Sequence, residues 1–368
     1  MKNFPVDAAF FRLLSLALLL LFSWSVATAA DHGCDVAGEY AFICGPKNAE
    51  DLVRVPGTKW IISSGMAEGG VLYLIDSDTK SFTELYPGDA PLARQNMQLY
   101  GACPGSPDPN SFVTHGLNLQ PGDGGHSTLY VVGHGGREAI EVFDVDATGE
   151  APVLTWSGCI MTPDGMEANS VASLADGSLL VTIPLRPGVP ISDAFTGKLT
   201  GQVYRWSPGD SGLTPVEGTE MPYANGIEVS ADGQEFYVAS SGQLTVSAFS
   251  NTNPARLLRR SETLGFVPDN LHMDNDGRLL TAGMNLVDPD CGPVKQSEEF
   301  DLEEFASCPR AFTVWSIDPQ SMRGRALATG PANPKFSNIT MALLIGDELW
   351  IGTFAGDRIA WSSVLHSD

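Results

Sequence analysis

The stretch ANGIEVSADGQEFYVAS, residues 224–240, decides the fold that the sequence predicts. Asn225 precedes a short run in which apolar and polar residues alternate. The dipeptide Asp232-Gly233 ends this run, and a second, more apolar run follows from residue 235. Because glycine accepts the positive φ of tight hairpin turns, an Asp-Gly between two alternating runs is a strong signal for a β-hairpin.

The same pattern recurs along the chain. Each copy has a polar residue or pair, an alternating run, a turn that contains glycine, and a more apolar run. The copies cover residues 51–64, 115–134, 169–183, 225–239, 269–282 and 338–353. Further strands are predicted between the hairpins, at residues 71–76, 139–144, 202–206 and 312–317. With about four strands in each copy, the sequence predicts an all-β, six-bladed β-propeller with a central channel. A pair of β-sandwiches is the alternative, and the repeat argues against it.

Length and charge agree with one propeller domain, which we expect over residues 31–368. The chain has 368 residues, of which 44 are acidic and 21 basic, so that its formal net charge is -23. This charge repels phosphate backbones and anionic membranes, which disfavours nucleic acid as a partner. It is compatible with a divalent cation. Nothing in the sequence identifies a protein partner.

Residues 1–30 have the pattern of a cleaved signal peptide. Basic residues flank the first segment, an apolar stretch covers residues 13–26, and Ala27-Thr28-Ala29 supplies small residues for cleavage. The alternative is an uncleaved membrane anchor, but the apolar stretch is shorter than the ~20 residues that span a bilayer. After cleavage, no stable membrane span is expected. The sequence therefore predicts an exported protein, periplasmic or secreted.

All six cysteines follow the predicted cleavage site, and an even number in an exported chain indicates disulfides. No Cys-x-x-Cys spacing points to a zinc site. The short-range pairs Cys34 with Cys44 and Cys291 with Cys308 are preferred, although the sequence leaves the other connectivities open.

The polar residues that head the copies predict a metal-binding channel, because the innermost strand of every propeller blade lines the axis. These residues are Glu50, His115, Asn169, Asn225, Asp269 and Asn270. Two carboxylates and three amides offer the hard oxygen ligands that Ca²⁺ prefers. The alternative is that each residue merely satisfies backbone groups of a turn. Gly116 and Gly226 follow two of them, and would let the strands approach closely at the axis.

These motifs resemble, in order and approximate spacing, the functional motifs of the paraoxonases. They are Glu50-Asp51-Leu52, His115-Gly116-Leu117, His134, Asn169, residues 224–227 and Asp269-Asn270-Leu271. The wider gluconolactonase and senescence-marker group is similar at the Glu, Asn and Asp positions, but does not generally have the two histidines. The resemblance covers nearly the whole mature chain. It implies a catalytic calcium held by Glu50, Asn169, Asn225, Asp269 and Asn270, and catalytic roles for His115 and His134.

The chain departs from the paraoxonase pattern at two places. The resemblance implies a second calcium at Asp51 and the backbone of Leu117, but Ser170 stands where an acidic residue is expected. No cysteine follows Cys308, so the family's disulfide between the two ends of the chain has no counterpart.

The resemblance implies a calcium-dependent hydrolase that opens lactones or aryl esters. In this reaction the metal polarises the carbonyl, and His115, assisted by His134, takes a proton from the attacking water. One alternative is a sugar lactonase of the gluconolactonase type. Another is a non-catalytic propeller that binds a ligand or partner and is stabilised by calcium. No Gly-x-Ser-x-Gly elbow accompanies a serine triad, and no nucleotide motif is present. Long connections at residues 86–112, 184–201 and 288–310 are expected to set specificity.

Overall fold

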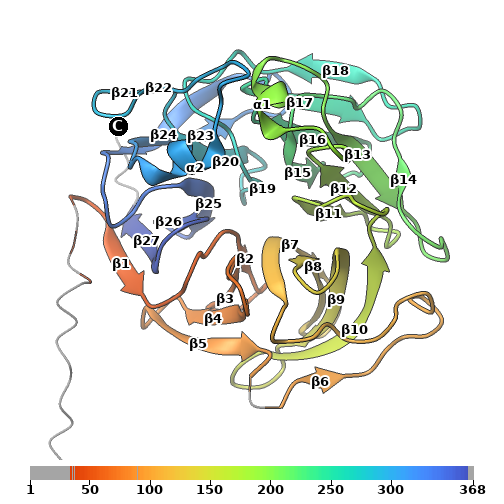
Figure 1. Cartoon of the computed structure of the whole chain (residues 1–368). Coiled ribbons are helices and arrows are strands. Elements are labelled where there is room, and N and C mark those ends of the chain that lie inside the picture. The colour runs from red at the N-terminus through yellow and green to blue at the C-terminus, as the bar shows by residue number, and fades with distance from the viewer. Residues whose placement is uncertain (1–33, 35, 37, 89, 364–368) are drawn as a thin grey trace, which may run out of the picture. The chain divides into compact units, whose positions relative to one another are not determined.

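The computed structural model describes residues 34, 36, 38–88 and 90–363. These residues form six sheets of four or five strands, arranged as blades around a central axis (Figure 1). The predicted six-bladed propeller is therefore confirmed. Within the described ranges, no helix is long and apolar enough to cross a membrane. The predicted signal peptide, residues 1–30, lies outside the described residues.

The first five blades are each built from strands that follow one another in the chain, with the first strand innermost. The first blade contains β2 (Leu52–Arg54), β3 (Trp60–Ser64), β4 (Leu72–Asp76) and β5 (Ser81–Tyr86). The second contains β7 (Val113–Pro121), β8 (His126–His134), β9 (Ala139–Asp146) and β10 (Val153–Met161), and β6 (Leu92–Ala93) pairs in parallel with β10. The third contains β11 (Val171–Ser173), β12 (Leu179–Ile183), β13 (Gln202–Trp206) and β14 (Thr214–Pro215).

The fourth and fifth blades continue the ring. The fourth contains β15 (Ala224–Val229), β16 (Glu235–Ser240), β17 (Thr245–Ser250) and β18 (Leu257–Arg260). The fifth contains β19 (Leu271–Met273), β20 (Leu279–Met284), β23 (Phe312–Ile317) and β24 (Gly324–Gly330). The paired runs that the sequence indicates as hairpins all form antiparallel strand pairs, because their alternating side chains pack on both neighbouring blades.

The sixth blade closes the ring with strands from both ends of the described chain. β25 (Ile339–Ile345), β26 (Glu348–Thr353) and β27 (Arg358–Ser363) pair in order. β1 (Ala41–Cys44) then pairs with β27, with Ala41 opposite Trp361 and Cys44 opposite Arg358. Ile43 of β1 belongs to an apolar cluster that includes Trp350 of this blade and Ile61 of the first. Strand pairing therefore joins the two ends of the chain within the sixth blade, and the shared core joins this blade to the first; among the described residues no disulfide links the two ends.

The described cysteines form three disulfides. The two predicted pairs, Cys34 with Cys44 and Cys291 with Cys308, are confirmed. The third bond joins Cys103 to Cys159, and so attaches the connection at residues 86–112 to β10 at the outside of the second blade.

Two glycines allow the inner strands to meet at the axis. Gly116 and Gly226 lie at bulges of β7 and β15. A Cβ at Gly116 would lie 2.5 Å from the carbonyl oxygen of Asn169, and one at Gly226 would lie 2.5 Å from the amide nitrogen of Leu271. The predicted close approach is confirmed, because no larger residue fits either position. Bulges also redirect neighbouring side chains, here those that precede the two glycines.

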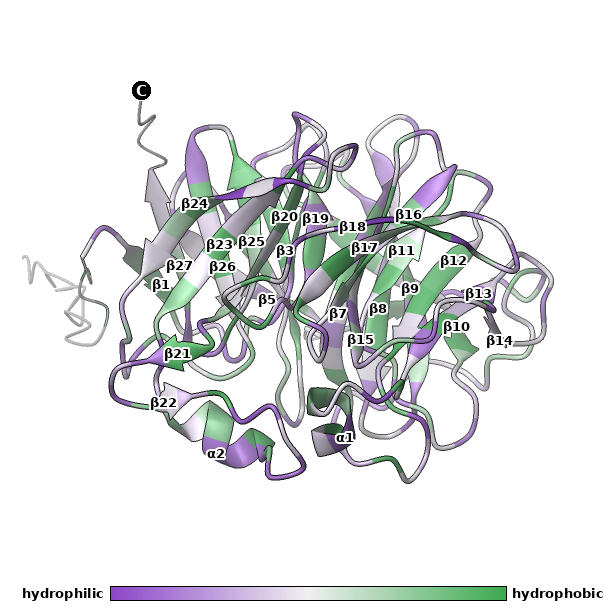
Figure 2. Cartoon of the chain, turned by 90° about the horizontal axis from the view of Figure 1, so that it is seen from above, coloured by the Kyte–Doolittle hydropathy of each residue, from purple (hydrophilic) through white to green (hydrophobic). Residues whose placement is uncertain are grey.

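Two insertions lie on the same side of the ring (Figure 2). One, between β12 and β13, contains α1 (Ile191–Phe195). The other, between β20 and β23, contains β21 (Val287–Asp288), β22 (Gly292–Pro293) and α2 (Leu302–Ser307), and the Cys291–Cys308 disulfide closes it. Phe195 and Phe300 stack with ring centroids 3.7 Å apart, so the two insertions contact each other.

Ring closure through β1 predicts that Ile43→Ala destabilises the whole propeller. Ile43 is 3% exposed, and its truncation should lower the free energy of unfolding by about 2 to 5 kcal/mol. Urea denaturation measures this change. Val36→Ala is the control, because Val36 is 67% exposed and should cost little. Equal stabilities of the two variants would contradict closure by this strand.

Candidate functional site

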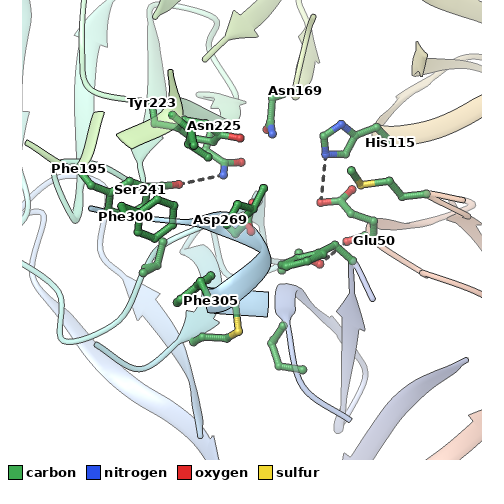
Figure 3. A pocket seen from close by; sticks show the side chains of 18 residues that line it. Glu50, His115, Asn169, Phe195, Tyr223, Asn225, Ser241, Asp269, Phe300 and Phe305 are labelled. Carbon is green, nitrogen blue, oxygen red and sulfur yellow. Dashed lines mark hydrogen bonds and ion pairs between the residues drawn. The ribbon is translucent and has the colours of Figure 1, made fainter. Parts of the chain in front are cut away.

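Polar side chains from five blades meet on the axis of the ring. Glu50 lies two residues before β2, the innermost strand of the first blade. His115 lies in β7, and Asn169 lies two residues before β11. Asn225 lies in β15, and Asp269 comes two residues before β19. These five side chains line one cavity of about 110 Å³ (Figure 3). Asn270 is buried beside them and donates to Glu50 Oε1 at 2.6 Å. The repeat therefore brings the predicted metal ligands and His115 together.

The sixth copy of the repeat contributes differently. Its polar residue, Asn338, has a positive φ of 59° and donates from its side-chain amide to the carbonyl of Ala306 in α2. Asn338 thus supports the insertion above the channel. In the same blade, Thr340 donates from its hydroxyl to the backbone carbonyl of Glu50 at 2.6 Å, which fixes the segment that bears the carboxylate.

Four of the five predicted ligands have a buried oxygen with no hydrogen-bond partner among the described residues. These atoms are Glu50 Oε2, Asn169 Oδ1, Asn225 Oδ1 and Asn270 Oδ1. The amide nitrogens of Asn225 and Asn270 do have partners, since Asn225 donates to Ser241 Oγ at 2.9 Å and Asn270 donates to Glu50. A buried polar atom without a partner costs about 1 to 3 kcal/mol. A group of oxygen acceptors in this state fits a hard cation such as calcium.

Ser241 fixes the orientation of one of these amides. Its hydroxyl accepts from Asn225 and donates to the carbonyl of Pro268 at 2.7 Å, so the Asn225 nitrogen is held away from the unpaired oxygens. The sequence analysis did not single out Ser241. Its position directly after β16, beside the head of the same hairpin, is the only signal that could have suggested it.

The carboxylates at the axis are destabilised in their charged form. Burial, followed by the nearby charges of Asp51 and Asp269, raises the pKa of Glu50 well above its ordinary value. Burial is also the main reason why the pKa of Asp269 is raised to about 7. A bound cation would reverse this penalty, because it favours both ionised forms.

Beside these ligands, two histidines form a hydrogen-bonded pair. His115 Nδ1 lies 2.9 Å from His134 Nε2, while His115 Nε2 lies 3.7 Å from Glu50 Oε1. Burial, together with His134, holds the pKa of His115 well below its ordinary value, so that the neutral ring is favoured. His134 does not line the axial cavity, but it contacts Glu138, whose Oε2 lies 2.5 Å from His134 Nδ1. Sequence reasoning missed Glu138.

Asp51 and Leu117, the residues implied for a second calcium, are also neighbours. The Leu117 N–H donates to Asp51 Oδ2 at 2.7 Å, and His272 Nε2 lies 2.6 Å from Asp51 Oδ1. Burial alone would lower the pKa of His272, but the carboxylates of Asp51 and Glu228 raise it above its ordinary value. Both oxygens of Asp51 therefore have hydrogen-bond partners among the described residues. The second calcium stays a prediction from the resemblance.

The insertions supply the apolar wall of the axial cavity. The apolar and aromatic residues that line it include Ile191, Phe195, Phe300, Leu302 and Phe305 from the two insertions. In Figure 3, three labelled phenylalanines lie across the cavity from His115. Two of the three long connections, at residues 184–201 and 288–310, thus reach the site as expected. None of the described residues in the connection at 86–112 lines the cavity, because β6 carries this segment to the outer edge of the second blade.

Known proteins share the fold of this chain, and one family model matches its sequence. The family model described as SMP-30/gluconolactonase/LRE-like region matches residues 66–288. A solved luciferin-regenerating enzyme is similar with a TM-score of 0.53 and 12% identity, over 88% of this chain and 94% of that one. A gluconolactonase from Xanthomonas campestris is similar with a TM-score of 0.52 and 16% identity, over 89% of each chain. No curated protein matches the sequence. At these identities the solved structures support the fold alone.

The raised carboxyl pKa values predict how the metal-free protein responds to pH. Because Asp269 titrates near 7 when folded and near 4 when unfolded, its unfavourable ionisation removes stability as the pH rises through this range. Asp269 should therefore lower the melting temperature of the chelator-treated protein as the pH rises from 4 to 7. In Asp269→Asn, the melting temperature should depend less steeply on pH over this range. Calcium should abolish most of the fall. Identical pH profiles with and without Asp269 would contradict this account.

Proposed function

Because the chain belongs to the SMP-30/gluconolactonase/LRE-like family, and this membership supports a lactonase-type function, we propose that the protein is a calcium-dependent lactonase. The observation that supports the proposal most strongly is the group of buried, unpaired oxygens that shares a cavity with His115. Glu50, Asn169, Asn225, Asp269 and Asn270 would hold the metal. When bound, calcium would polarise the substrate carbonyl and stabilise the negative charge that develops on its oxygen.

The residues of the chain supply the proton transfers and the surroundings of the reaction. His115 takes a proton from the water that adds to the carbonyl, because its ring is neutral and adjoins the ligand Glu50. His134 hydrogen-bonds to the other nitrogen of His115 and assists it. The phenylalanines of the insertions exclude bulk water from the cavity, which strengthens the electrostatic interactions inside it.

The apolar wall favours a lactone or aryl ester with a hydrocarbon group. Phe195, Phe300 and Phe305 offer no hydrogen-bonding atoms from their side chains, so the hydroxyl groups of a sugar lactone would lose their partners in water at this wall. A hydrocarbon chain or ring would instead bury apolar surface there, which is favourable by about 25 cal/mol per Å².

A sugar lactonase is the second candidate, because the matching family model includes gluconolactonases in its description. The polar end of the cavity, with Asn169, Asn225 and Ser241, could accept sugar hydroxyls. The third possibility is a non-catalytic propeller in which calcium only stabilises the axis. The two lactonase candidates place a small-molecule substrate in this cavity, the third binds a ligand or a partner, and none of the three requires nucleic acid. Three disulfides are compatible with an exported protein, and we propose a periplasmic or secreted location.

Metal dependence is tested with γ-nonalactone, phenyl acetate and gluconolactone as substrates. Chelator should abolish hydrolysis and calcium should restore it. Asn225→Ala should lower kcat/KM at least about 100-fold and weaken calcium binding, because it removes a ligand from a buried cation. Asn275→Ala is the control, since Asn275 is exposed in a turn of the fifth blade. Full activity in excess chelator would refute the calcium-dependent lactonase, and calcium-stabilised but inactive protein would favour the binding propeller.

Phe300→Ser tests the substrate class. This variant should raise KM for γ-nonalactone about 10-fold, because it removes an aromatic ring from the apolar wall. Hydrolysis of gluconolactone should change much less. Leu257→Ser on the outer strand β18 is the control for a new serine, since Leu257 is 47% exposed. Equal losses for both substrates, or efficient hydrolysis of gluconolactone alone by the unmodified protein, would favour the sugar lactonase.

A further inference from the structure

Glu138 continues the histidine pair toward the surface. Its carboxylate oxygen Oε2 lies 2.5 Å from His134 Nδ1, and His134 Nε2 lies 2.9 Å from His115 Nδ1. The exposed fraction of the side chain rises along this series, from 10% for His115 to 16% for His134 and 30% for Glu138. The three residues thus form a continuous hydrogen-bonded path from the axial cavity to solvent.

The turn between β8 and β9 holds Glu138 in place. Gly135 has φ of 92°, and a Cβ there would lie 1.8 Å from the carbonyl oxygen of Ser111, so only glycine fits. The backbone carbonyl of Glu138 accepts from both the N–H and the hydroxyl of Thr162. The turn therefore contacts Ser111 through Gly135 and is hydrogen-bonded to Thr162 at Glu138. These contacts fix the backbone from which the carboxylate of Glu138 reaches His134.

Among the described residues, the carboxylate of Glu138 pairs with His134 and not with Arg137, the residue that precedes it in the sequence. Arg137 turns the other way and makes two hydrogen bonds to the buried carboxylate of Glu141, at 2.7 and 2.8 Å. Trp156 Nε1 donates to the same carboxylate at 2.7 Å. Because Nε and Nη2 of Arg137 both donate to Glu141, the guanidinium faces away from Glu138, whose carboxylate contacts the imidazole of His134.

We propose that Glu138 is a positioning residue that, through His134, determines which nitrogen of His115 accepts a proton in the axial cavity. A carboxylate can only accept, so it selects the form of His134 with hydrogen on Nδ1. His134 Nε2 is then an acceptor and takes the hydrogen of His115 Nδ1. This leaves the lone pair of His115 on Nε2, the nitrogen near Glu50. The proposal deepens the proposed function and rests on it for its catalytic consequence.

The same order of hydrogen bonds allows a balanced proton transfer during hydrolysis. Water forms its bond to the carbonyl carbon as one O–H bond breaks, and its proton passes to His115 Nε2. The proton on His115 Nδ1 moves to His134 Nε2, and that on His134 Nδ1 moves to Glu138. When the carbonyl re-forms, the C–O bond to the leaving oxygen breaks and that oxygen takes the proton from His115 Nε2. The other two protons move back along the same path, so both rings regain their starting forms. No net charge then stays on either ring. The side chain of Glu138 is more exposed than that of His115, so its carboxylate can hold the proton at the solvent end of the path.

The full chain, loaded with calcium, is compared with Glu138→Gln and Glu138→Asp. Glutamine can donate to His134 Nδ1 as well as accept from it, so the selection of one imidazole form is lost, whereas aspartate keeps an acceptor. Glu138→Gln should lower kcat for γ-nonalactone about 10- to 100-fold, with KM and calcium affinity unchanged. Glu138→Asp should recover most of the rate. Asp123→Asn, at the opposite end of the same blade, controls for the lost surface charge.

Nitrogen-15 NMR of the imidazole rings supplies a readout that does not need turnover. His134 should carry hydrogen on Nδ1 and His115 should keep an unprotonated Nε2 in the unmodified protein and in Glu138→Asp. In Glu138→Gln, these signals should shift toward the other form. Unchanged imidazole forms together with unchanged kcat in Glu138→Gln would overturn the proposal. If the unmodified protein opens no lactone, the proposed function fails, and the NMR result alone decides the role of Glu138.

Discussion

The axis of this propeller depends on one electrostatic constraint, which is the burial of two carboxylates and several amide oxygens without enough hydrogen-bond donors. Glu50 is buried and Asp269 is half-buried beside Asp51, and their desolvation raises the pKa of both. The Asn270 amide donates to one oxygen of Glu50 and the Asn225 amide donates to Ser241, so Glu50 Oε2 and the amide oxygens have no donor among the described residues. Such an arrangement is unfavourable by itself and becomes favourable around a cation. A metal site therefore accounts for it in physical terms.

The rest of the architecture holds these oxygens together. The proposed ligands stand at the heads of four inner strands, with Asp269 and Asn270 both before β19, and Gly116 and Gly226 let neighbouring inner strands approach within contact distance. Pairing of β1 with β27 closes the ring, so repulsion at the axis cannot simply open the blades. The insertions around α1 and α2 then cover one side with phenylalanines, which gives the site an apolar wall.

Much of this could be predicted from the sequence because the fold repeats. The alternating runs and Asp-Gly turns indicated the hairpins, and equivalent positions in a propeller share an axis, so Asn169 and Asn225 could be grouped although they lie far apart in sequence. Features that occur once could not be derived in this way. Glu138 sits in a turn whose direction depends on packing of Gly135 against Ser111, and His272 occupies the place beside Asp51. The stacking of Phe195 on Phe300 depends on how two unrelated insertions fold.

The central claim, that the axial oxygens bind calcium, is tested most directly by calorimetric titration of calcium into the metal-free protein near pH 6.5. Measurements in buffers with different ionisation enthalpies separate binding from proton release. Because Asp269 titrates near 7 without metal, and the pKa of Glu50 is also raised, calcium should bind and displace protons into the buffer. The account predicts saturable binding whose heat depends on the buffer, and a smaller proton release in Asp269→Asn, where Glu50 alone still releases a proton. Absence of calcium binding would contradict it.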